Sequence, residues 1–432
     1  MPHLPTLLIQ VGVILIVARL VGFIFRKIHQ PQVMGEMVAG ILLGPSLLGW
    51  IAPNLSAAIF PPESLGFLNS LSQIGLLIFM FLVGLELDPQ VLRSRKHAAV
   101  VTSHVSIIAP FLLGTALALY LYPRLSDDSV SFVHYALFIG IAMSITAFPV
   151  LARILTERKL LRTPIGSLTI ACAAVDDVTG WTILAGVVLL VRADQTSMPL
   201  WLMILGAMAY TLVMLLVIRP LLNYLESLYK RRGTLSQDIM AIIFLLVLAS
   251  SLITELLGIH ALFGAFLAGA IMPKQHGLVH VLTEKLEDIS VILLLPIFFA
   301  FTGLRTTIGL VSGAEMWVYC FLVILVAIVG KFGGSTIAAR ISGVPWREAG
   351  ALGVLMNTRG LMELVVLNIG LDIGVLSPAM FTIMVLMALI TTFMTTPLLE
   401  WIYSERLIPA ADIVEFQEAG TAALVKEELT GS

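Results

Sequence analysis

Three strongly apolar stretches of this 432-residue chain carry ionisable side chains. Two adjacent carboxyl groups, Asp176 and Asp177, lie within AVDDVTGW, and Lys331 lies within VGKFGG. Arg359 and Glu363 lie within NTRGLMELV. An ionisable residue at the centre of a membrane helix costs roughly 3 kcal/mol on insertion scales. A chain that places several of them there is expected to use them for an ion or proton pathway.

The adjacent aspartates suggest a division of tasks. Neighbouring residues on a helix point about 100° apart, so Asp176 and Asp177 cannot face the same partner. One carboxylate can pair with a lysine while the other opens to a water-filled cavity. A purely structural ion pair between helices is the alternative interpretation, but one aspartate would suffice for it and a second adds only cost.

Two apolar segments contain residues that interrupt a helix. Residues 144–155 read SITAFPVLARIL, where the proline removes a backbone donor and frees a carbonyl group. Residues 357–370 read NTRGLMELVVLNIG. Interrupted hydrophobic segments at corresponding positions of two halves point to a transport site near the bilayer midplane. The residues at these breaks are Ser144, Thr146 and Pro149 in the first segment, and Asn357, Thr358 and Gly360 in the second. A proline kink without function is the alternative, which the nearby aspartate pair disfavours.

Such residues must be positioned by membrane-spanning helices, and the composition agrees. Hydrophobic residues make up 59% of the chain and charged residues 12%, with a mean hydropathy of +1.01. Soluble globular chains have about 45–50% and 25%. The net charge of −2 argues against a nucleic-acid binder. The sequence shows no nucleotide loop, metal-finger spacing or nucleophile–base pair. We therefore expect an all-α polytopic membrane protein without a cofactor and without enzymatic activity.

Apolar runs near 20 residues are long enough to cross a bilayer. Thirteen are predicted: 5–25, 32–50, 65–86, 98–122, 131–155, 163–191, 199–222, 239–257, 259–273, 287–308, 315–339, 347–370 and 376–403. The eighth and ninth are separated only by Gly258. With six spans on each side of a linking seventh, each break falls in the fifth span of its half. Equivalent spans of the two halves are then seven apart, and this odd number makes the halves inverted repeats.

The basic residues predict the orientation of these spans. With the N-terminus outside, only Arg124, Arg192 and Arg305 fall in outer loops, whereas most of the other basic residues fall in inner loops. This bias predicts that the N-terminus is outside and the C-terminus cytoplasmic. Residues 404–432 are expected to form a short cytosolic tail. A bacterial inner membrane is the expected location.

Eight sequence blocks in the same order resemble the monovalent cation/proton antiporter-2 superfamily. Within it, the chain is most similar to the branch of plant cation/H+ exchangers and their bacterial and fungal relatives. The blocks are QVMGEMVAGILLGPSLLG (32–49), FLVGLELD (81–88), SITAFPVLARIL (144–155), AVDDVTGW (174–181), GIHALFGAFLAGAIMP (258–273), LPIFFAFTGLRT (295–306), VGKFGG (329–334) and NTRGLMELVVLNIG (357–370). They cover nearly the whole chain.

The resemblance implies roles for individual residues. Asp177 would bind H+ or a metal cation in turn, and Asp176 would pair with Lys331 when no cation is bound. Thr146 would supply a neighbouring oxygen ligand. Glu363 is close to an acidic position of relatives, and Arg359 is expected to neutralise the crossing of the broken helices. The accessory residues of this crossing are Asn357, Thr358, Ser144 and Pro149.

The resemblance also implies an architecture for residues 1–403. Its members share the fold of sodium/proton antiporters, with crossed broken helices, and are homodimers. An ion-translocating core (98–191 and 315–403) would move against a dimerisation scaffold (1–97 and 239–308), joined by a linking helix (199–222).

The expected function is exchange of Na+ or K+ for H+ across the membrane by alternating access. Since one carboxylate holds either a proton or a cation, competition would enforce the exchange. Exchange is expected to be electrogenic if Lys331 also releases its proton. Two alternatives stay open: a channel-like potassium efflux pathway without obligate proton movement, and an organic-anion carrier of the same fold.

Overall fold

The computed structural model describes residues 4–86, 96–127, 129–158, 160, 163–195, 199–232, 235–274 and 277–403, and all regular structure within them is helical. The predicted tail, 404–432, lies outside the described residues. The helices of the first half are α1 (Leu4–Lys27), α2 (Gln32–Leu43), α3 (Leu48–Ile51), α4 (Pro53–Ile59), α5 (Pro62–Glu86), α7 (Lys96–Leu125), α8 (Phe132–Ser144), α9 (Phe148–Glu157) and α10 (Pro164–Gln195). The central region has α11 (Leu200–Val213), the π-helical turn η1 (Met214–Ile218) and α12 (Arg219–Arg232). The second half has α13 (Gln237–Leu256), α14 (Ala261–Ala270), α15 (Leu278–Ile289), η2 (Ser290–Leu294), α16 (Leu295–Leu304), η3 (Ile308–Leu310), α17 (Gly313–Ile328), η4 (Val329–Gly333), α18 (Gly334–Ile341), α19 (Trp346–Met356), α20 (Leu361–Asp372) and α21 (Pro378–Ile402).

These helices confirm the prediction of an all-α membrane protein. Within the described ranges, eleven are long and apolar enough to cross a membrane, and the bent pair α19–α20 makes a twelfth. The predicted segment 259–273 contains only α14, whose 10 residues are too few to cross the hydrocarbon core alone. Each of the other twelve predicted spans coincides with one of these crossing segments.

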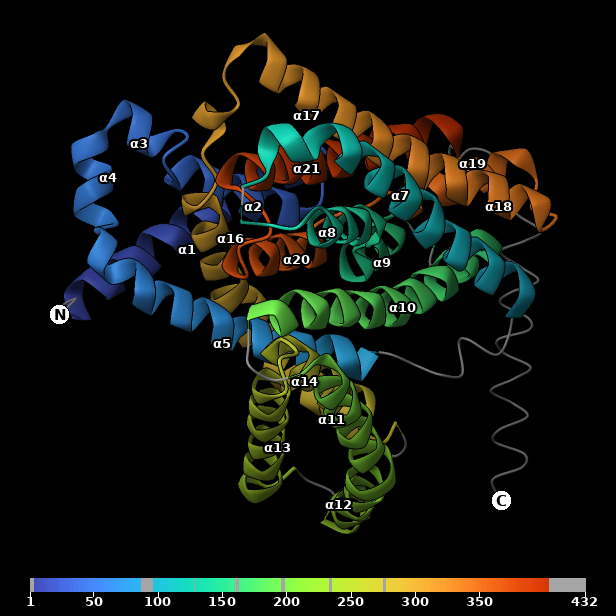
Figure 1. Cartoon of the computed structure of the whole chain (residues 1–432). Coiled ribbons are helices and arrows are strands. Elements are labelled where there is room, and N and C mark those ends of the chain that lie inside the picture. The colour runs from blue at the N-terminus through green and yellow to red at the C-terminus, as the bar shows by residue number, and fades with distance from the viewer. Residues whose placement is uncertain are drawn as a thin grey trace.

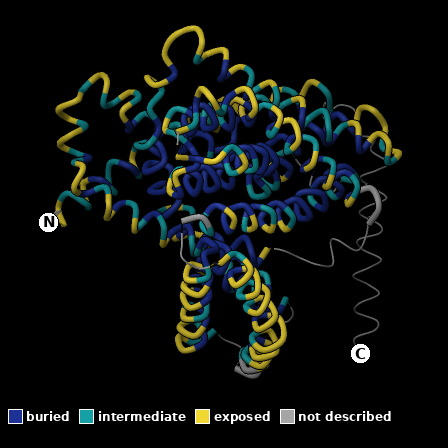
Figure 2. Tube along the Cα trace, viewed as in Figure 1, coloured by how far each residue is buried: buried dark blue, intermediate teal, exposed yellow. Residues whose placement is uncertain are grey.

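The helices pack in two groups around the broken segments. In one group, α7 packs against α8, α10, η4 and α18, and α19 packs against α18 and α21. In the other, α2 packs against α1 and α16, and α5 packs against α14 and α16. The helices α11–α12 and α13 extend from this body as a pair (Figure 1), and Figure 2 shows that most of their surface is exposed. Their exposed side chains are mainly apolar, as expected of helices that face lipid.

The two predicted breaks lie against each other. The first separates α8 from α9 at residues 145–147, and the second bends α19 relative to α20 by 43°. The backbone N–H of Ala147 donates to the carbonyl of Thr358 at 3.0 Å, so each break satisfies a group that the other leaves without a helical partner. Gly360 has φ of +155°, and a Cβ there would lie 2.9 Å from Cγ2 of Val150. Glycine is therefore needed where the two broken segments meet.

Candidate ion-binding site

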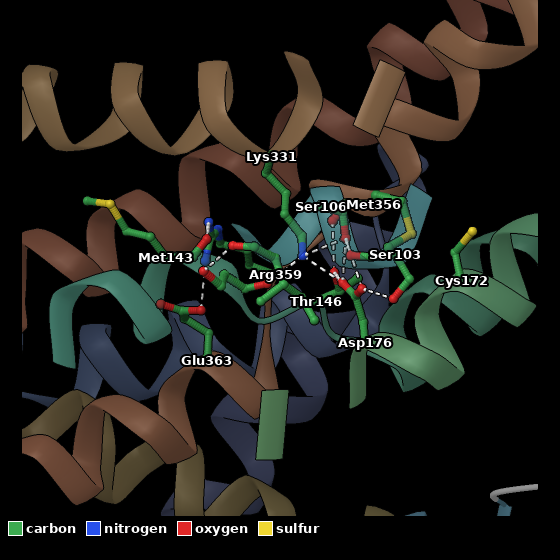
Figure 3. A network of polar contacts seen from close by, with 12 residues as sticks. Ser103, Ser106, Met143, Thr146, Cys172, Asp176, Lys331, Met356, Arg359 and Glu363 are labelled. Atoms are coloured by element: carbon green, nitrogen blue, oxygen red, sulfur yellow. Dashed lines mark hydrogen bonds and ion pairs between the residues drawn. The ribbon is translucent and has the colours of Figure 1, made fainter. Parts of the chain in front are cut away.

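The carboxylate of Asp176 is the centre of a buried polar cluster (Figure 3). Lys331 pairs with it, with Nζ 2.7 Å from Oδ2. Three hydroxyl groups also donate to it: Ser103 at 2.6 Å from Oδ1, Ser106 at 2.9 and 3.0 Å from the two oxygens, and Thr146 at 2.9 Å from Oδ2. These donors come from α7, η4 and the break after α8, so the cluster joins the broken helix to its neighbours.

Asp177 has the opposite surroundings. It is only 2% exposed, and neither of its carboxyl oxygens has a hydrogen-bond partner. The rotation of about 100° between adjacent helical residues turns this carboxyl group away from the donors that surround Asp176. A buried carboxylate without partners is costly, and either a proton or a cation would remove that cost. Carboxylate oxygens are also the ligand type that hard monovalent ions prefer.

Two cationic side chains meet the C-terminal end of the half-helix α8. Lys331 donates to the carbonyl of Ser144, the last residue of α8. Arg359 donates to the carbonyls of Ala142 at 3.0 Å and Met143 at 2.5 Å. The final carbonyls of a helix have no helical partners and carry the negative end of its dipole. Both cations thus stabilise the interrupted helix as well as the carboxylates.

Arg359 also forms a fully buried ion pair with Glu363, with Nη1 2.8 Å from Oε2. Glu363 lies in the first turn of α20, where the positive end of the helix dipole favours a carboxylate. The hydroxyl of Thr392 holds the backbone of Arg359 in place. It accepts a hydrogen bond from the Arg359 N–H at 3.0 Å, and it is within donating distance of the Arg359 carbonyl oxygen at 2.9 Å. Asp176 and Glu363 are therefore each paired with a cationic side chain, whereas Asp177 forms no ion pair among the described residues.

The other predicted residues line the crossing. Thr146 contacts Asp176 and the carbonyl of Met356 at 3.1 Å, rather than Asp177. Pro149 is in the first turn of α9, where its missing N–H costs nothing. The side-chain oxygens of Asn357 and Thr358 are buried without hydrogen-bond partners. The hydroxyl of Ser144 donates within α8 or to the carbonyl of Ile107 on α7.

Ser103 and Ser106 are not among the residues predicted from the sequence. They lie three residues apart on α7, so both face Asp176. The run TSHVS (102–106) could have indicated these two serines, since hydroxyl residues at this spacing form a polar patch on one face of an otherwise apolar helix.

A cavity of about 350 Å³ lies beside the crossing, between α2, α5, α9, α15 and the start of α20. Its lining includes Glu36, Glu86 and Glu287, with Arg153 from α9. The excess of carboxylates favours cations in this space. Leu295 of α16 and Leu361 of α20 also line it.

The two helices that contribute these leucines are joined at their other ends. Arg305, which follows α16, pairs with Asp372 at the end of α20, with Nη2 2.5 Å from Oδ1. Arg192 on α10 similarly pairs with Glu255 on α13 at 2.8 Å. The Arg305–Asp372 pair therefore joins α16 to α20 at their ends remote from the cavity, and the Arg192–Glu255 pair joins α10 to α13.

Comparisons with known proteins agree with this arrangement. Residues 12–402 match the family model for the transmembrane sodium/hydrogen exchanger. The chain is 47% identical over 402 residues to the Na+/H+ antiporter NhaS4 of Synechocystis, covering 92% of this chain and 97% of that protein. It is 42% identical to cation/H+ antiporter 17 of Arabidopsis thaliana over 93% of this chain and 48% of the plant protein. It is 35% identical to K+/H+ antiporter 1 of Saccharomyces cerevisiae over 92% of this chain and 46% of the yeast protein.

The chain thus spans about half the length of these plant and yeast relatives. Among solved structures, the sodium proton antiporter MjNhaP1 of Methanocaldococcus jannaschii matches with a TM-score of 0.63 over 91% of this chain and 96% of that one. At 15% identity this match shows the fold, that of a sodium/proton antiporter. The chain belongs to the transmembrane sodium/hydrogen exchanger family, whose members are cation/proton antiporters and not enzymes.

Proposed function

We propose that this antiporter exchanges Na+ or K+ for H+ and that Asp177 binds the proton and the cation in competition. The observation that carries the proposal is the buried carboxyl group of Asp177, whose two oxygens have no hydrogen-bond partner. Two nearby carboxylates are paired with cations, Asp176 with Lys331 and Glu363 with Arg359, and Glu86 adds a further negative charge that acts on Asp177. An ionised Asp177 therefore adds an unbalanced negative charge, which either H+ or a monovalent cation neutralises.

This balance explains why exchange would be obligatory. An unpaired buried charge is unfavourable, so a site without either ion resists moving through the apolar interior. A site that holds a proton or a cation has no such unpaired charge on Asp177 and can move. Since both ions need the same carboxylate, each must leave before the other binds. Leakage of either ion alone is thereby suppressed.

The packing supports a division into a moving core and a scaffold. We assign residues 98–191 and 315–403 to a core that carries the site, and residues 1–97 and 239–308 to a scaffold, with 199–222 as the linking helix. The acidic cavity lies between these two bodies and gives access from one side of the membrane. The pairs of Arg305 with Asp372 and Arg192 with Glu255 close the other side. The bias of the basic residues supports an outer position for that closed side.

The orientation and the assembly belong to the same proposal. We propose an N-terminus outside and a cytoplasmic C-terminus, which the loop charges support, in a bacterial inner membrane. We also propose a homodimer, which the family resemblance supports. Labelling of a cysteine introduced at Ser126 or at Ser342 with an impermeant reagent tests the orientation, because these residues lie in predicted outer and inner loops. The wild type, with buried Cys172 and Cys320, gives the background. Native mass measurement of the protein in lipid tests the dimer.

Proton flux in liposomes tests the central claim. An imposed pH difference is dissipated by adding Na+, K+ or Li+ to wild-type protein and to Asp177→Asn. We expect dissipation by at least one cation in the wild type and none in the variant. Equal dissipation in both contradicts the role of Asp177, and ion flux without proton movement favours a channel-like pathway.

The relatives named as Na+/H+ and K+/H+ antiporters leave both cations as candidates, and the ion that responds identifies the substrate. We propose further that Lys331 releases its proton when Asp176 turns to the cation, which makes exchange electrogenic. A reversal potential that matches one-for-one exchange contradicts this step.

A further inference from the structure

We infer that an apolar cavity between α10, α11, α13 and α14 binds an acyl chain of a membrane phospholipid. The cavity has a volume of about 660 Å³ and shares no lining residue with the acidic cavity beside the crossing. Its lining on α10 begins at Val178, which directly follows Asp177. The bound chain therefore lies between the helix that carries the ion site and the proposed scaffold. Binding of the chain goes beyond the proposed exchange and does not depend on it.

The cavity opens toward the bilayer. It lies where the pair formed by α11–α12 and α13 joins the body of the protein (Figure 1), and α10, α11 and α13 belong to segments long and apolar enough to cross a membrane. Three of its lining residues are exposed: Val178 at 44%, Ile204 at 42% and Met208 at 58%. Exposed apolar side chains on membrane-spanning helices face lipid. A lipid chain can thus enter the cavity directly from the bilayer.

The length and width of the cavity fit a hydrocarbon chain. Its lining on α10 follows one helix face from Val178 to Leu189, which is a rise of about 16 Å at 1.5 Å per residue. This is close to half of the ~30 Å hydrocarbon core, the depth of one leaflet. Spread over that length, the cavity volume corresponds to a width of about 7 Å. A helix of a second copy, about 10–12 Å in diameter, is too wide for this gap, whereas a chain of carbons in contact at about 4 Å fits it.

The lining offers hydrocarbon surface rather than polar groups. It contains no charged side chain, in contrast to the acidic cavity. Its four hydroxyl groups are already hydrogen-bonded inside the protein: those of Thr182, Thr211 and Thr254 to carbonyls of their own helices, and that of Tyr210 to Ser250 of α13. An ion or a polar headgroup would lose its water here without gaining partners, so the acyl part of a lipid is the chemistry that fits.

Side chains on α10 both leave the gap open and hold it apart. Ala185 and Gly186 line the cavity without filling it, and a Cβ at Gly186 would meet no atom of another helix within 4 Å. Trp181 packs against Phe263 and Phe266 of α14, with ring centroids 5.4 and 6.0 Å apart, so its bulk separates α10 from α14. Protein interiors are close-packed, and an unfilled gap forfeits dispersion contacts. Occupancy by a chain from the bilayer restores these contacts.

The test maps where lipid chains touch the full-length protein in vesicles of phosphatidylethanolamine and phosphatidylglycerol. The probe is a phosphatidylglycerol with a diazirine in one acyl chain, which inserts into adjacent side chains on illumination and is located by peptide mass spectrometry. Leu248 of α13, which is 55% exposed, is the reference for ordinary contact with the bilayer. We expect comparable labelling of Phe263 and Phe266, although these lining residues are only 8% and 9% exposed.

Filling the cavity from the protein side provides the decisive variant. Gly186→Leu should lower the labelling of Phe263 and Phe266 several-fold and leave that of Leu248 unchanged. The matched control is Gly12→Leu on α1, where a Cβ also meets no atom of another helix within 4 Å, and it should keep the wild-type pattern. Labelling of Leu248 without labelling of the two phenylalanines overturns the inference, and a second copy covering the cavity would give this result. Unchanged labelling of the phenylalanines in Gly186→Leu also overturns it.

The labelling requires no ion movement, so its outcome is separable from that of the proposed function. If the wild type is labelled as expected but shows no cation-coupled proton flux, the proposed function falls and the lipid site stands. If the wild type is coupled but Phe263 and Phe266 stay unlabelled, only the lipid site falls. Monodispersity and thermal unfolding check that Gly186→Leu and Gly12→Leu keep their fold, so that a change of labelling is read only from intact protein.

Discussion

The pair of Lys331 and Asp176 gives the sharpest prediction about energetics. Both side chains are almost completely buried, at 0% and 1% exposure. Removing one member of a buried ion pair costs about 3–5 kcal/mol, because the other charge is left without compensation. In Lys331→Gln, the hydroxyls of Ser103, Ser106 and Thr146 still hold Asp176. We therefore expect the lower end of this range, about 3 kcal/mol.

Asp176→Asn should cost a similar amount, since Lys331 keeps the Ser144 carbonyl as its main acceptor. The double variant removes both charges, so neither remains uncompensated. It should lose about 3 kcal/mol instead of the roughly 6 kcal/mol that independent effects would give. The coupling energy is thus about 3 kcal/mol.

Reversible unfolding of detergent-solubilised protein, by denaturant or by heat, measures these three variants. Arg153→Gln is the control, because Arg153 forms a half-exposed pair with Glu157 on the same helix, with 34% and 45% exposure. Such pairs contribute about 0.3–0.5 kcal/mol. If the double variant loses the sum of the single losses within about 0.5 kcal/mol, the two side chains are not coupled and the described pair is wrong.

Two further predictions concern the crossing and the closed side. Gly360→Ala should destabilise the protein by about 1–3 kcal/mol, because its φ of +155° is unfavourable for a residue with a Cβ. The control Gly333→Ala should be nearly neutral, because there is open space around Gly333. Equal unfolding free energies of the two variants contradict the argument. Arg305→Gln should increase hydrogen exchange at the end of α20 several-fold by releasing Asp372, and combining it with Asp372→Asn should add little. Unchanged exchange in Arg305→Gln indicates that this pair does not hold the closed side.

The crossing shows why tertiary structure matters in this fold. Sequence patterns placed one break among Ser144, Thr146 and Pro149 and another among Asn357, Thr358 and Gly360, and the structure has both. The hydrogen bond from Ala147 to Thr358 could not be predicted from either segment alone, because it joins residues more than 200 positions apart. Lys331 lies within the π-helical turn η4, and single π-turns inside helices are frequent at functional sites.

The sequence alone determined the class of the protein, the apolar segments, the two interruptions and the charged residues at membrane depth. These properties are local: about 20 apolar residues are needed to cross a bilayer, and proline, glycine or a charge acts at its own position. Only the tertiary structure decided which carboxylate receives Lys331, that two serines of α7 hold it, and that Asp177 has no partner. Those outcomes depend on how helices distant in sequence are rotated and packed, and a rotation of 100° decides which of two adjacent aspartates is satisfied.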